Sequence, residues 1–446
     1  MLGMLENNGS KILFYGALGA GMYPLSQALA AEGFSVIGLD REAAADGGYP
    51  YPIYTSLPEE TYSQIGLAVR SLAIPEDRPE LLRLRSLGVG VIDRPHMLDI
   101  YSRRFSTSVA VSGSHGKSTV TAMLAHILRK AGIAFTAVGG AELFDGKSVH
   151  LGGGDIVLYE ACEYRDAFLA LRPTLAVITA VDRDHVDYFP DEQTYLDSFL
   201  RFAGRARSLV VNGDMPYAQR FRELDRGAVF FGEGEGAQYR YCFEGKGSLG
   251  QEFSLTYGDS RLRSALPVIG RYNIANAAAA IAAAHALGID PAVSAEALAT
   301  YRGIARRLER LEDLDGRPVY YDYGHHPTEL RASITALIEE GEALTVVFRP
   351  HTYTRTAAFM TELAEALAMA DRAIVLDIFP AREEPIPGVD GFALARLVGR
   401  GAVACSPDGA ADYVRNHTDG TLLLLGAGDM SALIDGLYGK CDKTKK

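Results

Sequence analysis

The sequence has few cysteines and no long apolar segment. Its four cysteines show neither the spacing of a metal site nor that of a disulfide framework, so we expect reduced thiols. No stretch approaches the roughly 18 apolar residues that a membrane helix requires. The N-terminus lacks the basic and apolar segments of a signal peptide. We therefore expect a cytoplasmic protein without membrane insertion. The cysteines are Cys162, Cys242, Cys405 and Cys441.

Positive charge is also scarce. The 446 residues include 44 basic and 56 acidic side chains, giving a net charge of −12 at pH 7. An acidic balance argues against a nucleic-acid partner, although it leaves room for a local basic pocket. The length predicts about two to four domains. We expect a monomer or a homodimer.

The segment 112–119, with the sequence Ser-Gly-Ser-His-Gly-Lys-Ser-Thr, is the most informative stretch. It follows a short apolar run that predicts a buried strand, and it precedes residues with the spacing of one helical face. A helix N-terminus favours an anion, and Gly113 and Gly116 allow the backbone to approach it. Lys117 supplies a charge for phosphates and Ser118 a hydroxyl for Mg²⁺. The pattern lacks the first glycine of the full phosphate-loop motif, so a tight turn that contains a lysine is the alternative.

A second glycine-rich turn lies near the N-terminus. Residues 11–15 predict a strand, Gly16–Met22 a turn that leads into a helix, and 35–40 a second strand. Such a βαβ unit seats a diphosphate. Leu18 stands where the usual fingerprint has its second glycine, so a turn that binds no nucleotide is the alternative. Asp40 either contacts a ribose or caps a loop.

Alternating strands and helices continue to the end of the chain. They predict three α/β domains: a Rossmann-like domain over 1–107, a central P-loop ATPase-type domain over 108–306, and a Rossmann-like domain over 307–446. Within them we expect a connector over 99–106, small antiparallel strands over 226–268, an alanine-rich helix over 273–287 and a helix over 356–369.

Acidic residues and a histidine follow two predicted strands of the central domain. Glu160 ends one strand, and the segment 184–187, Asp-His-Val-Asp, follows the next. With the Ser118 hydroxyl, Glu160 and His185 suit Mg²⁺ beside phosphates, although Mg²⁺ prefers oxygen ligands. The alternatives are a solvated acid or helix cap for Glu160, and a hydrogen-bond donor for His185.

Two polar segments follow strands of the third domain. Residues 322–329 read Asp-Tyr-Gly-His-His-Pro-Thr-Glu, and 348–355 read Phe-Arg-Pro-His-Thr-Tyr-Thr-Arg. Adjacent histidines at a strand-to-helix turn are difficult to explain by packing. The planar fork of arginine suits carboxylate or phosphate recognition, and a solvated basic loop is the alternative.

Together these segments resemble the Mur ligase family over nearly the whole chain. The ordered set carries the resemblance more than any single motif does. The doubled histidine, with the later Pro-His-x-Tyr-Thr-Arg, points to the alanine-adding branch or its close relatives. The matching segments are 16–22, 113–119, 160–164, 184–185, 270–276, 306–307, 322–329, 350–356 and 426–429.

The resemblance implies an ATP-dependent ligase that joins L-alanine to the carboxylate of UDP-N-acetylmuramate through an acyl phosphate, in peptidoglycan precursor synthesis. It places Gly16, Gly19, Gly21, Met22 and Asp40 at the UDP-sugar, and Tyr323, His325, His351 and Arg355 at the amino acid. It places Gly113, Ser114, His115, Gly116, Lys117, Ser118, Thr119, Asn273, Asn276, Arg307 and Asp322 at ATP, and Ser118, Glu160 and His185 at Mg²⁺. The catalytic set that it implies is Lys117, Glu160, His185, Asp322, His325 and Arg355.

Some positions depart from the family pattern. None of the departures removes Lys117, Glu160, His185 or Asp322, so we expect activity. Two alternatives remain: a related ligase that adds another amino acid or a recycled peptide to the same UDP-sugar, and a non-catalytic nucleotide-binding paralogue. The departures are Leu18, Ala180, Tyr272, Tyr321, Arg349 and Thr352.

Overall fold

The computed structural model describes residues 9–44, 47–143, 146–224, 227–399 and 401–439. The first eight residues and Cys441, on which the sequence analysis bears, lie outside these ranges. The chain divides into two compact units, each built from several stretches. The first contains Met1–Val181, Leu196–Arg240 and Ala278–Ala297, and the second contains Asp182–Tyr195, Tyr241–Ala277 and Leu298–Lys446.

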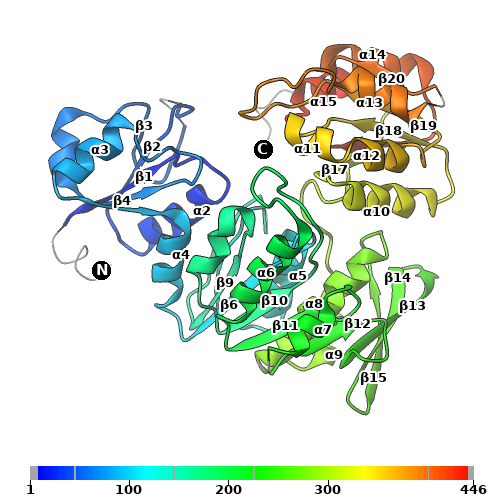
Figure 1. The fold of residues 1–446 in the computed structure, drawn as a ribbon. Coiled ribbons are helices and arrows are strands. Elements are labelled where there is room, and N and C mark those ends of the chain that lie inside the picture. The colour runs from blue at the N-terminus through cyan, green and yellow to red at the C-terminus, as the bar shows by residue number, and fades with distance from the viewer. Residues whose placement is uncertain (1–8, 45–46, 144–145, 225–226, 400, 440–446) are drawn as a thin grey trace. The chain divides into compact units, whose positions relative to one another are not determined.

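The first unit begins with a five-stranded parallel sheet of order β3-β2-β1-β4-β5 (Figure 1). Strand order reverses between β1 and β4, which is the position where open α/β sheets bind ligands. The glycine turn after β1 lies at this position. The strands are β1 (Lys11–Tyr15), β2 (Val36–Leu39), β3 (Ile53–Tyr54), β4 (Ile65–Arg70) and β5 (Gly90–Asp93). The helices are α2 (Met22–Ala31), α3 (Pro79–Ser86), α4 (Arg94–Ser102) and the 3-10 helix η1 (Glu59–Gln64).

The first unit also carries strands of order β12-β11-β10-β6-β9-β7-β8, parallel except for β8. Strand β6 has a neighbour on each side, which explains its uninterrupted apolar run. The strands are β6 (Thr107–Ser112), β7 (Thr136–Val138), β8 (Val149–Leu151), β9 (Ile156–Glu160), β10 (Leu175–Ile178), β11 (Ser208–Asn212) and β12 (Val229–Gly232). The helices are α5 (Lys117–Lys130), η2 (Tyr164–Ala170), α6 (Glu192–Ala203), α7 (Ala218–Arg222) and α9 (Pro291–Leu298). The first turn of α6 and the last residue of α9 are assigned to the second unit.

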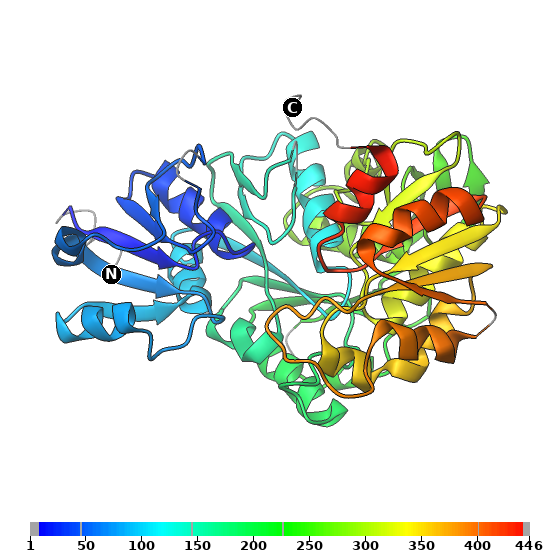
Figure 2. The ribbon, with the colours of Figure 1, turned by 90° about the horizontal axis from the view of Figure 1, so that it is seen from above.

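The second unit contains a six-stranded sheet of order β16-β17-β21-β18-β19-β20, parallel except for β16. Alternate residues of β18 face opposite sides: Val346 packs with α10, α12 and α13, and Val347 packs with α14 and α15. Figure 2 shows helices on both faces of this yellow-to-orange sheet. The strands are β16 (Glu309–Arg310), β17 (Val319–Asp322), β18 (Leu344–Phe348), β19 (Arg372–Leu376), β20 (Val403–Cys405) and β21 (Thr421–Leu425). The helices are α10 (Pro327–Ile338), α11 (Tyr353–Ala358), α12 (Met360–Leu367), α13 (Gly391–Val398), α14 (Pro407–His417) and α15 (Ser431–Tyr438).

The remaining strands are β13 (Tyr239–Gly247), β14 (Gly250–Tyr257) and β15 (Ser260–Leu266), and α8 (Tyr272–Ala286) follows them. Strands β14 and β15 are antiparallel, as expected, and α8 confirms the alanine-rich helix. Strand β12 was expected to be antiparallel as well, but it pairs in parallel with β11 and β13.

Two further expectations about local structure are wrong. The connector over 99–106 is helical as far as Ser102, because α4 begins at the Asp93 cap and buries Met97, Leu98 and Tyr101. The helix over 356–369 is two helices, α11 and α12. Phe359, with φ −119° and ψ 22°, separates them. Among the described residues, no helix is both long and apolar enough to cross a membrane.

Candidate functional site

The phosphate-loop candidate lies between β6 and α5 of the first unit. Gly113 and Gly116 have positive φ angles of 143° and 82°. A Cβ on Gly113 would lie 2.1 Å from the Thr179 hydroxyl, so the loop backbone packs directly against the end of β10. Gly116 precedes α5 without a side-chain cap. The loop therefore has the close backbone packing and the uncapped helix N-terminus that suit a phosphate.

Lys117 begins α5 and is held by a carboxylate. Its ammonium donates to the two oxygens of Glu163, at 2.8 and 3.1 Å, and to the Gly113 carbonyl. The Glu163 side chain is only 1% exposed. Burial favours the neutral amine, but Glu163 together with the nearby Cys162 and Glu160 outweighs it, so the pKa of Lys117 is raised. Lys117 is therefore charged and in place at the mouth of the helix.

Ser118 and Glu160 lie next to each other, as the predicted metal site requires. The Ser118 hydroxyl donates to one Glu160 oxygen at 2.9 Å, and the backbone N–H of Gly140 donates to the other at 2.7 Å. A hydroxyl and a carboxylate at this distance fit an ion that prefers oxygen ligands. His185, the third predicted ligand, belongs to the second unit. The magnesium assignment stays a prediction.

The N-terminal glycine turn is closed by its own hydrogen bonds. The N–H of Gly19 donates to the Gly16 carbonyl at 3.1 Å, and the N–H of Met22 donates to the Gly19 carbonyl at 2.8 Å. The Asp40 carboxylate accepts from the N–H groups of Leu18 and Glu42, at 2.9 and 3.1 Å. In this structure Asp40 therefore caps the loop, and its contact with a ribose stays a prediction.

In the second unit, Arg355 is held by Asp184. Its Nε and Nη2 donate to the two Asp184 oxygens at 2.9 and 3.2 Å, and both side chains are at most 10% exposed. Burial opposes ionisation of Asp184, but His185 and Arg355 lower its pKa well below the usual range. Arg355 Nη1 donates to Nδ1 of His351 at 3.1 Å. The predicted amino-acid residue Arg355 thus has a carboxylate partner within the protein.

His325 and His351 are neutral and have fixed tautomers. The Tyr323 carbonyl lies 3.2 Å from Nδ1 of His325, and since a carbonyl only accepts, Nδ1 carries the proton. Nδ1 of His351 accepts from Arg355, so its proton is on Nε2. Burial lowers the pKa of His325 to about 4 and that of His351 to about 3. The ring centroids are 5.6 Å apart, so the predicted amino-acid residues gather in one cluster.

Asp322 ends β17 and is buried. Its oxygens accept from the N–H groups of Gly324 and Leu308 at 2.6 and 2.7 Å. Burial raises the pKa of Asp322 to about 6, although the Arg307 charge opposes the shift. The phenol of Tyr272 has a pKa raised by burial and by the Asp322 charge. Asn273, next along α8, donates to the Ile269 carbonyl and accepts from Asn276.

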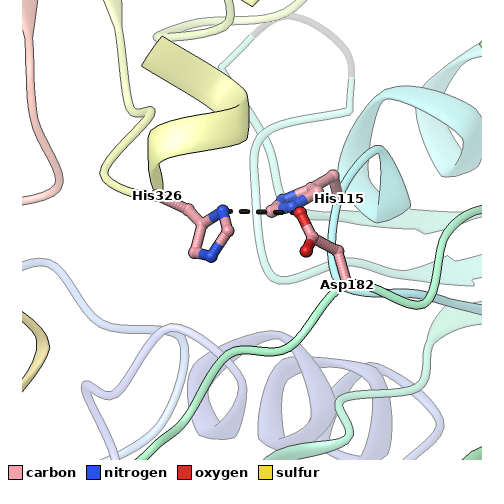
Figure 3. A group of neighbouring side chains, drawn as sticks. All are labelled: His115, Asp182 and His326. Carbon is pink, nitrogen blue, oxygen red and sulfur yellow. Dashed lines mark ion pairs between the residues drawn. The ribbon is translucent and has the colours of Figure 1, made fainter. Parts of the chain in front are cut away.

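His326, the neighbour of His325, caps α10. Its Nε2 donates to the Arg183 carbonyl at 3.1 Å, and its Nδ1 accepts from the N–H of Thr328. Nδ1 also lies 3.5 Å from an Asp182 oxygen, and the Thr328 hydroxyl donates to the same carboxylate at 2.6 Å. Figure 3 marks the contact between His326 and Asp182 with a dashed line. His326 therefore positions the start of α10 and the segment that begins at Asp182.

The positions that depart from the family pattern have structural contacts. The Ala180 carbonyl accepts from the N–H of Ser114 at 2.9 Å, which braces the phosphate loop. Arg349 donates to the Asp429 carbonyl. Thr352 has a positive φ of 63° and precedes α11. Tyr321 faces the Arg306 guanidinium at 5.7 Å.

The structure thus groups the predicted residues within each unit. Sequence reasoning assigned no role to Glu163 or Asp184, although each is the partner of a predicted cation. Both lie in segments that the sequence analysis named, 160–164 and 184–187. The presence of an acidic residue without an assigned role in each segment could have predicted an ion-pair partner.

Three family models match successive parts of the chain. Residues 11–106 match the catalytic domain of the Mur ligase family, 111–284 match the Mur ligase middle domain, and 306–428 match the glutamate ligase domain. These matches confirm the predicted fold of three α/β domains. The exact domain boundaries stay a prediction.

The chain is similar to curated relatives over almost its whole length. It is 34% identical to the UDP-N-acetylmuramate–L-alanine ligase of Renibacterium salmoninarum, over 97% of each chain. It is 31% identical to the enzyme of the same name from Caldicellulosiruptor bescii, over 97% of this chain and 99% of that one.

Solved structures share the fold. The UDP-N-acetylmuramate–alanine ligase of Thermotoga maritima has a TM-score of 0.79 at 25% identity, covering 97% of this chain and 98% of that one. The murein peptide ligase of Psychrobacter arcticus has a TM-score of 0.69 at 19% identity, over 97% and 99% of the two chains. With matches of this extent in both sequence and fold, the chain belongs to the Mur ligase family.

Proposed function

We propose that this protein is an ATP-dependent ligase that joins L-alanine to the carboxylate of UDP-N-acetylmuramate in peptidoglycan precursor synthesis. The observation that carries the proposal is the 34% identity over 97% of the chain to an enzyme of that activity. The pairs Lys117–Glu163 and Ser118–Glu160 support it, because they place a cation and a possible metal ligand at the loop before α5, where a nucleoside triphosphate would bind. We also infer action in the cytoplasm, as a monomer or a homodimer.

The first step activates a poor acyl donor. A carboxylate oxygen of the sugar attacks the γ-phosphorus of ATP, ADP leaves, and an acyl phosphate forms. Lys117 and the α5 N-terminus supply positive charge for the phosphoryl oxygens, where negative charge accumulates. When bound, Mg²⁺ would neutralise phosphate charge, held by Ser118, Glu160 and His185.

The second step joins the amine. The ammonium group of the amino acid first loses a proton, and the free amine attacks the acyl carbonyl. As phosphate leaves, the nitrogen loses a second proton. Because Nδ1 of His325 is protonated, its Nε2 has the free lone pair that accepts this proton. The Nε2–H of His351 and the charge of Arg355 suit the amino acid's carboxylate.

Nucleotide contacts from the second unit complete the proposal. Asp322, ionised above about pH 6, has the acceptor oxygens for ribose hydroxyls, and Arg307 supplies a cation next to it. Asn273 and Asn276 lie in the first turns of α8, where their amides can bind the nucleotide.

The test is phosphate release by the purified protein with ATP, Mg²⁺ and UDP-N-acetylmuramate, across a panel of amino acids and peptides. We expect turnover with L-alanine and a product whose mass equals the UDP-sugar plus alanine minus water. Turnover with another amine only would identify a related ligase. ATP binding without turnover for any amine would identify a non-catalytic paralogue.

A further inference from the structure

Thr352 has a backbone conformation that threonine rarely adopts. Its φ is 63° and its ψ is 148°. These angles lie at the margin of a region that is almost confined to glycine, and a β-branched side chain makes them more costly still. A residue keeps such a conformation only where surrounding contacts impose it. Thr352 lies between His351 and Arg355, so the contacts that impose it bear on the proposed amino-acid site.

These contacts come from residues 379–383, in the connection between β19 and α13. The N–H of Phe379 donates to the Pro350 carbonyl at 2.8 Å, and the Phe379 carbonyl accepts from the N–H of Thr352 at 2.9 Å. The rings of Phe379 and His351 are stacked, with centroids 5.7 Å apart and planes at 17°. Phe379 therefore holds the turn before α11 through both its backbone and its ring.

Glu383, in the same segment, holds the start of α11. One of its carboxylate oxygens accepts from the N–H of Thr354 at 2.8 Å, and the other accepts from the Thr354 hydroxyl at 2.6 Å. Thr352, the residue at the N-cap position, makes no side-chain cap. A carboxylate near the N-terminus of a helix is also stabilised by the helix dipole. Glu383 therefore supplies, from 29 residues away, the cap that α11 lacks locally.

The position of α11 decides where the Arg355 side chain lies, because Arg355 is the next residue after Thr354. Its guanidinium donates to both oxygens of Asp184, at 2.9 and 3.2 Å, and to Nδ1 of His351 at 3.1 Å. A planar fork makes such a set of bonds in one orientation only. All of these residues belong to the second unit. A shift of α11 that released Thr354 would therefore disturb both contacts of Arg355.

Stability of the fold does not account for this arrangement. Glycine at position 352 would adopt the same angles with less strain, and a serine or aspartate in the usual extended conformation would cap α11 directly. The chain instead has a strained threonine and a cap from a distant segment. Strained backbone persists at sites where it directs side chains toward a ligand. Here the side chains on either side of the strained residue are those of His351 and Arg355.

We propose that Glu383 is a positioning residue for the amino-acid substrate. With Phe379 it holds the strained turn at Thr352, so that His351 and Arg355 lie together where the substrate carboxylate binds. The assignment rests on the proposed function, because it takes an amino acid to be the substrate of these two residues. Glu383 acts through α11 and does not contact the substrate itself.

The test is steady-state kinetics and thermal melting of the full chain. We expect Glu383→Ala to raise the KM for L-alanine about tenfold, as for the loss of one charge-assisted hydrogen bond, and Glu383→Gln to raise it about threefold, because the amide keeps one acceptor. The KM values for ATP and UDP-N-acetylmuramate, and kcat at saturating L-alanine, should change by less than about twofold. Glu384→Gln, which alters the exposed neighbouring acid, is the matched control and should change none of these.

A second variant tests the strain argument. Thr352→Gly should raise the melting temperature, because glycine adopts the left-handed φ without strain. In the Glu383→Ala background it should also return part of the lost affinity for L-alanine, because a glycine turn depends less on the contacts that impose its shape. If Thr352→Gly lowered the melting temperature, or left the KM of Glu383→Ala unchanged, the strain argument would be overturned.

A double-mutant cycle tests whether Glu383 acts through Arg355. Glu383→Ala should add less than about twofold to the KM of Arg355→Lys, because both changes release the same fork. Full additivity would overturn the positioning role, and so would a rise of all three KM values together or a change in melting temperature alone.

The wild-type protein separates this proposal from the function itself. If it turned over L-alanine while Glu383→Ala left the KM for L-alanine unchanged, the function would stand and the role of Glu383 would fail. If it turned over only another amine, the function would fail, and the KM for that amine would decide the role of Glu383. If it turned over no amine, both proposals would fail.

Discussion

Two regions of the protein hold a basic side chain against a carboxylate, and they do so differently. Beside the phosphate loop, Lys117 pairs with Glu163, 46 residues later in the chain. In the second unit, Arg355 pairs with Asp184, 171 residues earlier. The ammonium of Lys117 can rotate and donate to another acceptor when a ligand binds. The planar guanidinium of Arg355 would lose both of its hydrogen bonds to Asp184 if it moved. We therefore expect an adjustable lysine and a fixed arginine.

The largest effect is expected for Lys117→Met. Loss of the ammonium removes charge stabilisation from phosphoryl transfer and should lower kcat by at least about 10²–10³. It also leaves the buried Glu163 without a partner, which should lower the melting temperature. Adding Glu163→Gln should restore much of the stability and none of the turnover. Phosphate release and calorimetry measure the two effects. If turnover returned with stability, Lys117 would be structural only.

A smaller effect is expected for Arg355→Lys, which keeps the charge and removes the fork. We predict a KM for L-alanine raised about tenfold and a lower melting temperature, because a hydrogen bond to a charged group contributes about 1.5–3 kcal/mol. The KM for ATP should stay nearly constant. Arg331→Lys is the control, since its pair with Glu365 is exposed and contributes little. Equal behaviour of the two variants would refute a fixed Arg355.

Asp322 is expected to produce a several-fold dependence on pH. As pH falls through about 6, protonation should remove acceptor oxygens and raise the KM for ATP. Protonation has the opposite effect on the stability of the folded protein, which Asp322 increases as pH falls. The pKa of an unfolded aspartate is about 3.9, so the protonated form stabilises the folded protein below that pH, and this contribution is lost as pH rises through 6. Melting temperature and KM measured from pH 4 to 8 should show both trends, and Asp322→Asn should show neither.

The smallest effect is expected for the two histidines near Arg355. Because burial lowers the pKa of His325 to about 4 and that of His351 to about 3, both stay neutral around pH 7. We predict that kcat at saturating L-alanine shows no inflection from either group between about pH 6 and 8. An inflection in this range that disappears in His325→Gln would show that the pKa of His325 lies nearer to 7 than its burial indicates.

The two regions also differ in how far the sequence predicted them. Lys117, Ser118 and the glycines lie in one short segment between a strand and a helix, so their chemistry follows from local order. The pairing of Arg355 with Asp184 depends on tertiary structure across 171 residues, and no local pattern specifies it. Strand and helix types were predictable for the same reason as the loop, whereas the break at Phe359 was not.

The segment Asp182–Tyr195 has a consequence for synthesis of the chain. It belongs to the second unit, although the residues on both sides of it belong to the first. On a ribosome that adds roughly 5–20 residues per second, Asp184 is made roughly 10–30 seconds before Arg355, 171 residues later. Throughout that interval Asp184 lacks the guanidinium that donates to both of its oxygens. A chaperone or a protease that acts on nascent chains would therefore bind or cleave this segment before Arg355 is made. A truncated chain that ends before Arg355 would stay susceptible.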